Sequence, residues 1–128
     1  MEQKAWLEHG EEFQINVTPV AKPRMTRADS WKKRPVVQRY WAFKDKIRAS
    51  GLVLPNSGFH VVFVIPMPKS WSKKKVSSML GQPHQQKPDV DNLAKGLLDA
   101  VFDEDCKVWD VRITKIWGDC GAINLTMI

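Results

Sequence analysis

Cysteine and long apolar stretches are scarce in this sequence. Cys106 and Cys120 belong to no Cys-x-x-Cys pair, so they build neither a disulfide framework nor a zinc site, and free thiols in a reducing compartment are expected. The longest apolar run, residues 61–67, is too short to cross a bilayer, and residues 1–6 hold no apolar run of a signal peptide. We therefore expect a cytoplasmic protein with no membrane partner.

Acidic side chains are scarce in one half of the chain. Residues 22–75 carry fourteen Lys or Arg against two acidic residues, a net charge of +12, whereas residues 89–119 carry eight acidic residues against four Lys or Arg, a net charge of −4. A basic surface attracts polyanions such as nucleic acid, although it can also serve solubility alone. An acidic segment within such a protein suits a bound cation.

The length of 128 residues and the hydrophobic content of 43% indicate one soluble domain, residues 1–128. Alternating or β-branched patterns predict four strands, at residues 11–17, 59–66, 108–117 and 122–128. Periodicity and terminal signals predict three helices, at residues 35–50, 70–81 and 89–102. Gly118–Gly121 is expected to be a hairpin turn between the last two strands. Residues 82–86 are expected to form a linker, with His84 at its surface.

Apolar spacing also predicts which side chains form the core. On the first helix these are Val36, Tyr40, Phe43 and Ile47. On the last helix they are Val90, Leu93, Ala94, Leu97, Leu98 and Val101. On the strand at residues 108–117, Trp109, Val111, Ile113 and Trp117 share one face.

Two basic segments are candidates for contact with nucleic acid. The first is a long loop around Trp31, with Lys22, Arg24, Arg27, Lys32, Lys33 and Arg34. Positive charges beside an aromatic ring suit contact with a phosphate backbone and stacked bases. The second is Lys73, Lys74 and Lys75 in the short helix. A surface loop and a solvated helix face are the alternatives for the two segments.

The acidic residues Asp89 and Asp91 stand at the expected start of the last helix, with Lys95 four residues after Asp91. If Asp89 is the residue that precedes the helix, its different dihedral angles let both carboxylates lean toward one point. Asp91 and Lys95 share a helix face. With the acidic group Asp103-Glu104-Asp105 further on, these residues suit a magnesium site for phosphate chemistry. The alternatives are helix capping by Asp89, a salt-bridge ladder along the helix and a solvated acidic turn.

Several of these motifs together resemble the RusA family of Holliday junction resolvases. The matching sequences are Lys87-Pro88-Asp89-Val90-Asp91-Asn92-Leu93 with Lys95, Leu98-Asp99-Ala100, Glu104-Asp105-Cys106-Lys107-Val108 and the run Val108-x-Asp110-x-Arg112-x-x-Lys115. Ser70-Trp71-Ser72-Lys73-Lys74-Lys75 resembles a phage or prophage branch of the family.

The resemblance implies a small α+β domain with a mixed β-sheet packed against helices. It implies that Asp89, Asp91 and Asp105 bind Mg²⁺, that Lys95 assists catalysis, and that a homodimer cleaves four-way DNA junctions by paired nicks. The setting would be DNA recombination, repair or phage DNA processing near the nucleoid of a bacterial host cell. Because Glu104 stands where the family often has aspartate, an approach of Asp103 or Glu104 to the metal stays open. The alternatives are a nuclease for flaps or forks and a protein that binds branched DNA without cutting it.

Overall fold

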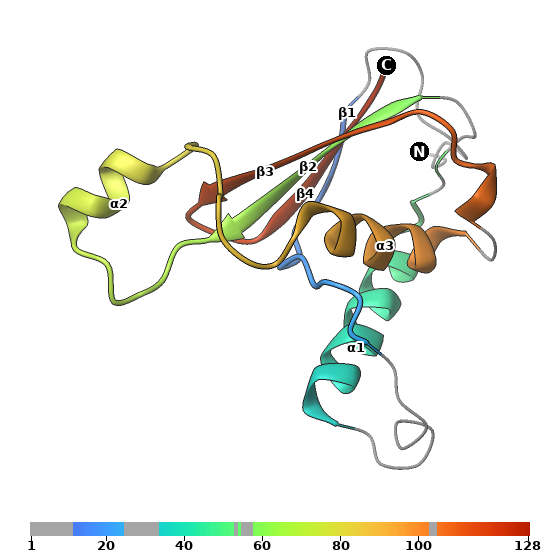
Figure 1. Ribbon diagram of the computed structural model, residues 1–128, viewed down its shortest axis with the longest axis horizontal. Coiled ribbons are helices and arrows are strands. Elements are labelled where there is room, and N and C mark those ends of the chain that lie inside the picture. Colours follow the sequence, from blue (N-terminus) through green and yellow to red (C-terminus); the bar gives the residue numbers. More distant parts are fainter. Residues whose placement is uncertain (1–11, 25–33, 53, 55–57, 103–104) are drawn as a thin grey trace.

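The computed structural model describes residues 12–24, 34–52, 54, 58–102 and 105–128, with the main chain alone at Asp105 (Figure 1). The predictions for Arg27, Lys32, Lys33, Asp103 and Glu104 concern positions outside these residues. In chain order the elements are β1 (Glu12–Ile15), α1 (Pro35–Ala49), β2 (Phe59–Pro66), α2 (Lys73–Met79), α3 (Val90–Val101), the 3-10 turn η2 (Asp105–Lys107), β3 (Val111–Gly118) and β4 (Ala122–Met127).

The four strands form one mixed sheet in the order β1-β4-β2-β3. β2 pairs with β3 in parallel, with Phe59 opposite Val111, and pairs with β4 in antiparallel, with Val61 opposite Leu125. β1 pairs with β4 in antiparallel at the far edge. The α+β fold with a mixed sheet and helices is confirmed.

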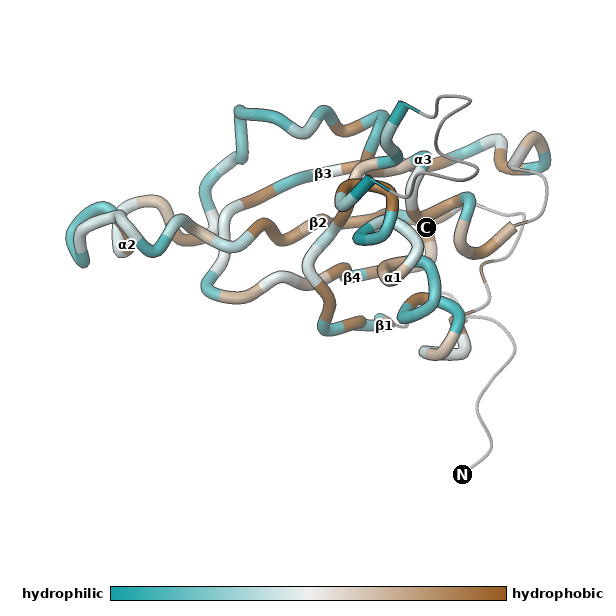
Figure 2. Tube along the Cα trace, turned by 90° about the horizontal axis from the view of Figure 1, so that it is seen from below, coloured by the Kyte–Doolittle hydropathy of each residue, from teal (hydrophilic) through white to brown (hydrophobic). Residues whose placement is uncertain are grey.

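Helices α1 and α3 lie on the same face of the sheet (Figures 1 and 2). They bury Phe59, Val61 and Phe63 of β2 beneath α3 residues such as Leu93 and Leu97. Removing each such side chain from water contributes about 1.5–3 kcal/mol, so this face holds the core. None of the helices in the described residues combines the length and apolar character needed to cross a membrane.

Three side chains expected in the core lie elsewhere. On α1 the buried residue of the first turn is Val37 rather than Val36, because both positions neighbour Tyr40 on a helix and spacing does not distinguish them. Val90 is 39% exposed at the first position of α3. Trp109 is 75% exposed because β3 begins only at Val111, where its pairing with β2 begins.

The turn at residues 118–121 is not a hairpin turn, contrary to expectation. β3 and β4 lie on opposite sides of β2 and are not paired with each other, so this turn carries the chain past the end of β2. A Cβ atom at Gly118 would collide with the side chain of Val64, and one at Gly121 would collide with Thr18. Glycine is needed at both positions because other segments approach the main chain closely.

The N-terminal segment after β1 lies against α3. The main-chain N–H of Lys22 donates to the carbonyl oxygen of Asn92 at 3.1 Å. A Cβ atom at Gly96 would stand 2.6 Å from the carbonyl oxygen of Val20, so only glycine permits this approach. This contact places the segment that leads into the basic loop beside the helix of the acidic motif.

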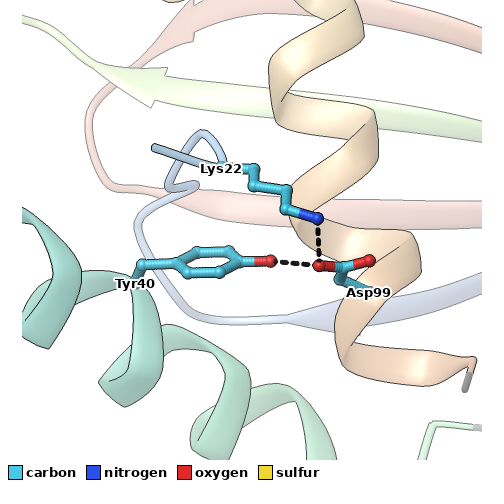
Figure 3. Close-up of polar contacts among 3 residues, drawn as sticks. All are labelled: Lys22, Tyr40 and Asp99. Carbon is cyan, nitrogen blue, oxygen red and sulfur yellow. Dashed lines mark hydrogen bonds and ion pairs between the residues drawn. The ribbon is translucent and has the colours of Figure 1, made fainter. Parts of the chain in front are cut away.

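Asp99 joins this segment to both helices (Figure 3). Its carboxylate accepts a hydrogen bond from the Tyr40 hydroxyl at 2.9 Å and forms an ion pair with Lys22 at 2.8 Å. Burial raises the pKa of Asp99, but the hydrogen bonds from Lys22 and Tyr40 and the positive charges nearby outweigh it, so the pKa lies below 3.8. The ionised carboxylate therefore stabilises the fold above the pKa of the unfolded state, and this contribution is lost as the pH falls through the folded-state pKa.

We predict that Asp99→Asn lowers the free energy of unfolding at pH 7 by about 1–2 kcal/mol, because the amide lacks the negative charge that Lys22 and Tyr40 stabilise on the carboxylate. The deficit should shrink as the pH falls below the unfolded-state pKa, because the contribution of the ionised carboxylate is progressively lost there. Urea denaturation at pH 7, 5 and 3 measures it, with Asp45→Asn on the exposed face of α1 as the control. An equal deficit at every pH would mean that the charge of Asp99 contributes nothing.

Candidate active site

Asp89 is the residue immediately before α3, whereas the sequence predicts a helix from residue 89 and offers the position before the helix only as a possibility. Its dihedral angles, φ −70° and ψ 149°, are extended, and its side chain makes no capping hydrogen bond. Asp91 lies in the first turn of α3, and both side chains are exposed. Helix capping therefore does not account for Asp89, and its carboxylate is available for another ligand.

Lys95 lies one turn after Asp91 on α3 and is exposed. Residues four apart share a helix face, so the ammonium and the Asp91 carboxylate are on the same side. The proposed salt-bridge ladder does not extend to Asp99, because that carboxylate is held by Lys22 and Tyr40. Asp89, Asp91 and Lys95 thus all stand exposed at the start of α3.

The segment before Asp89 is attached to β3. The main-chain N–H of Gly81 donates to the carbonyl oxygen of Trp117, and the N–H of Trp117 donates to the carbonyl oxygen of Gln82. The N–H of His84 donates to the carbonyl oxygen of Lys115. The Lys115 ammonium then donates to the carbonyl oxygens of Gln86 and of Pro88, the latter at 2.8 Å. The peptide bond between Lys87 and Pro88 is cis.

Two open hollows are lined in part by Asp89. One is lined by His84, Gln85, Gln86, Lys87, Asp89, Val90 and Lys115. The other is lined by Lys87, Pro88, Asp89 and Asn92. Val90 is exposed because it faces the first of these hollows rather than the core. Lys87 and Asp89 border both hollows, so a ligand in either hollow can reach Asp89.

His84 is buried, contrary to the expected surface position. Its ring packs against Trp117, with the ring centroids 4.3 Å apart. Burial, and then the positive charge of Lys115, lower the pKa of His84, so the ring is neutral at pH 7. Its Nδ1 has no hydrogen-bond partner within the described part of the chain. His84 thus supports the linker, and the linker is part of the folded structure.

Asp105 begins the turn η2 between α3 and β3, but its side chain is outside the described residues. Among the side chains that the structure describes, no group of three His, Cys, Asp or Glu could hold a metal ion. The convergence of Asp105 with Asp89 and Asp91 therefore stays a prediction. The two exposed aspartates fit Mg²⁺, which binds through one or two carboxylates and keeps several waters.

The basic residues predicted to contact DNA fall into three groups. Lys22 is paired with Asp99, and Arg34 donates to the carbonyl oxygen of Arg24 at 2.9 Å, joining the two flanks of residues 25–33. The residues predicted within that segment, Arg27, Lys32 and Lys33, are outside the described set. The third group is Lys73, Lys74 and Lys75, all exposed on α2.

α2 lies beyond the end of the sheet, away from α1 and α3 (Figures 1 and 2). Ser72 caps it by accepting a hydrogen bond from the Lys75 N–H. Trp71 packs against Trp117 with the ring centroids 4.7 Å apart, and the Lys75 ammonium lies over the Trp71 ring at 4.3 Å. The lysines of α2 are therefore carried on an anchored helix.

Lys115 is the functional candidate that sequence reasoning missed. Its position in the run Val108-x-Asp110-x-Arg112-x-x-Lys115 was the available signal, but that run assigns no role to it. The contact with Gln86 and Pro88 spans more than 25 residues of sequence, so no local spacing predicts it.

Comparison with known proteins places the chain in one family. No curated protein sequence matches the chain significantly. The family model described as endodeoxyribonuclease RusA matches residues 14–128, nearly the whole chain. The match includes the second half of β1, α3 with Asp89 to Lys95, and β3 with Lys115. The chain therefore belongs to the RusA family of endodeoxyribonucleases, whose members act on Holliday junctions.

Proposed function

We propose that this protein is a magnesium-dependent endonuclease that resolves four-way DNA junctions in recombination or repair. The observation that carries the proposal is the arrangement at the start of α3 in a chain of this family. Asp89 stands before the helix with a carboxylate that caps nothing, and Asp91 and Lys95 follow on its exposed first turns. Asp89, Asp91 and Asp105 are the proposed metal ligands, and Lys95 is the proposed catalytic cation.

The chemistry follows from these residue types. A bound magnesium ion would lower the pKa of a coordinated water and offset charge on the scissile phosphate. Lys95 donates hydrogen bonds to the phosphate oxygens, on which negative charge grows in the transition state. Attack of a water oxygen on phosphorus would form the new P–O bond and break the bond to the 3′ oxygen. The water would lose one proton and the 3′ oxygen would take one up. The products are a 5′-phosphate and a 3′-hydroxyl.

The proposal includes a homodimer, because a junction is resolved by two symmetric nicks and each subunit has one site. The sheet offers a surface for it. Helices α1 and α3 cover one face, and no helix in the described residues covers the other (Figure 1). Val62, Val64 and Ile116 on that second face are partly buried apolar side chains. Pairing of two such faces would remove them from water.

We predict that Asp91→Asn and Lys95→Ala both reduce junction cleavage by at least about 100-fold, but for different reasons. Asp91→Asn weakens metal binding, so excess Mg²⁺ should restore part of its rate. Lys95→Ala keeps the carboxylates, so excess Mg²⁺ should restore nothing. Parallel magnesium titrations of single-turnover rates on a synthetic junction separate the two.

Asp119→Asn, in the exposed turn between β3 and β4, is the matched control and should cleave at the wild-type rate. Junction binding without metal should survive in both site variants, since neither removes the basic surface. Wild-type cleavage by both site variants would place the active site elsewhere in the chain.

We also predict that α2 binds the phosphate backbone. Lys73→Gln with Lys74→Gln should weaken junction binding and reduce the slope of log K against log salt concentration by about 2, because each lost phosphate contact removes about one unit. Lys75 is left intact because it contacts Trp71. The control, Arg39→Gln with Lys46→Gln on α1, removes the same charge from exposed positions. Equal slopes for the two double variants would show that α2 contributes only net charge.

A further inference from the structure

The side chain of Lys115 makes its hydrogen bonds outside its own strand, β3. In the register of the sheet Lys115 is opposite Phe63, so it points to the face covered by α3 rather than to the open face. From there its ammonium donates to the carbonyl oxygens of Gln86 and Pro88. Both acceptors belong to the short segment that ends at Asp89.

The bond to Pro88 controls where Asp89 lies. The carbonyl group of Pro88 and the N–H of Asp89 belong to one planar peptide unit, so fixing the oxygen fixes the direction in which the Asp89 main chain leaves. On its other side, the carbonyl oxygen of Asp89 accepts the N–H of Leu93 at 3.1 Å. The main chain of Asp89 is therefore held from both sides, while its carboxylate makes no capping bond.

The ammonium is not needed to attach residues 81–84 to the sheet. The main-chain bonds of Gly81, Gln82 and His84 to β3 do that, together with the packing of His84 against Trp117. The influence of the ammonium is thus confined to residues 86–88. A variant without it should keep its fold and lose only the alignment of Asp89.

We propose that Lys115 is a positioning residue that aligns Asp89 for metal binding, an inference that rests on the proposed function. The competing role is that of a plain positive charge beside Asp89, since both residues line the same hollow. The two roles predict opposite results. If Lys115 positions Asp89, removing the ammonium weakens metal binding; if it acts only as a charge, removing it relieves repulsion and tightens metal binding.

The test is a titration of Mn²⁺ into the full chain without DNA, followed by electron paramagnetic resonance of the free ion. Lys115→Met should raise the dissociation constant by about tenfold, the usual effect of losing a group that orients a metal ligand. Lys115→Arg keeps donors and should recover part of the affinity. Arg112→Met removes a charge from the same strand on the opposite face and should bind Mn²⁺ like the wild type.

Cleavage kinetics provide a second readout. Lys115→Met should lower kcat on a junction while KM stays within about twofold, because the basic DNA-binding residues are unchanged. Thermal unfolding shows whether the variant is folded.

The outcomes are distinguishable. Failure of the wild type to bind Mn²⁺ would overturn the proposed function and this inference with it. Binding by the wild type with equal or tighter binding by Lys115→Met would overturn the inference alone. An absence of recovery in Lys115→Arg would overturn the role of the hydrogen bonds.

Discussion

The main chain at Asp89 is the constraint on which the candidate site depends. Asp89 has extended dihedral angles and is followed at once by helical residues, so its carboxylate and that of Asp91 leave the chain in different local geometries. Lys115 holds the peptide before Asp89, and the first helical hydrogen bond, from Leu93, holds the carbonyl after it. These two hydrogen bonds hold the main chain on either side of Asp89, while its side chain makes no capping hydrogen bond. A metal ligand needs a main chain that is held in place and a carboxylate that makes no competing hydrogen bond.

Most elements of the fold could be predicted because local patterns encode them. The eight residues of β2 were predicted with their observed bounds, and α1 and α3 to within a residue at either end. The pairing of strands is not local. The turn at residues 118–121 reads as a hairpin turn, but it crosses the end of β2, because β2 lies between β3 and β4. Trp109 was misplaced for the same reason, since only the pairing with β2 sets where β3 begins.

The candidate site likewise has one part that local sequence predicts and another that depends on long-range contacts. Asp91 and Lys95 are four residues apart, so helix geometry was sufficient to predict that they share a face of α3. The convergence of the carboxylates of Asp89 and Asp91 stays a prediction. Lys115 reaches the site only through the parallel pairing of β2 and β3 and the path of the linker along β3. His84 looked like a loop residue because nothing near it in sequence indicates that Trp117 covers it.

The most direct measurement is cleavage of three DNA substrates of matched sequence, a four-way junction, a flap and a linear duplex, with Mg²⁺ and with EDTA. We predict paired, symmetric nicks in two opposing strands of the junction with Mg²⁺, none with EDTA, and far slower cutting of the flap and the duplex. Cleavage of the junction in EDTA would contradict the metal-dependent mechanism. Equal cutting of all three substrates would contradict junction resolution as the function of the site at Asp89.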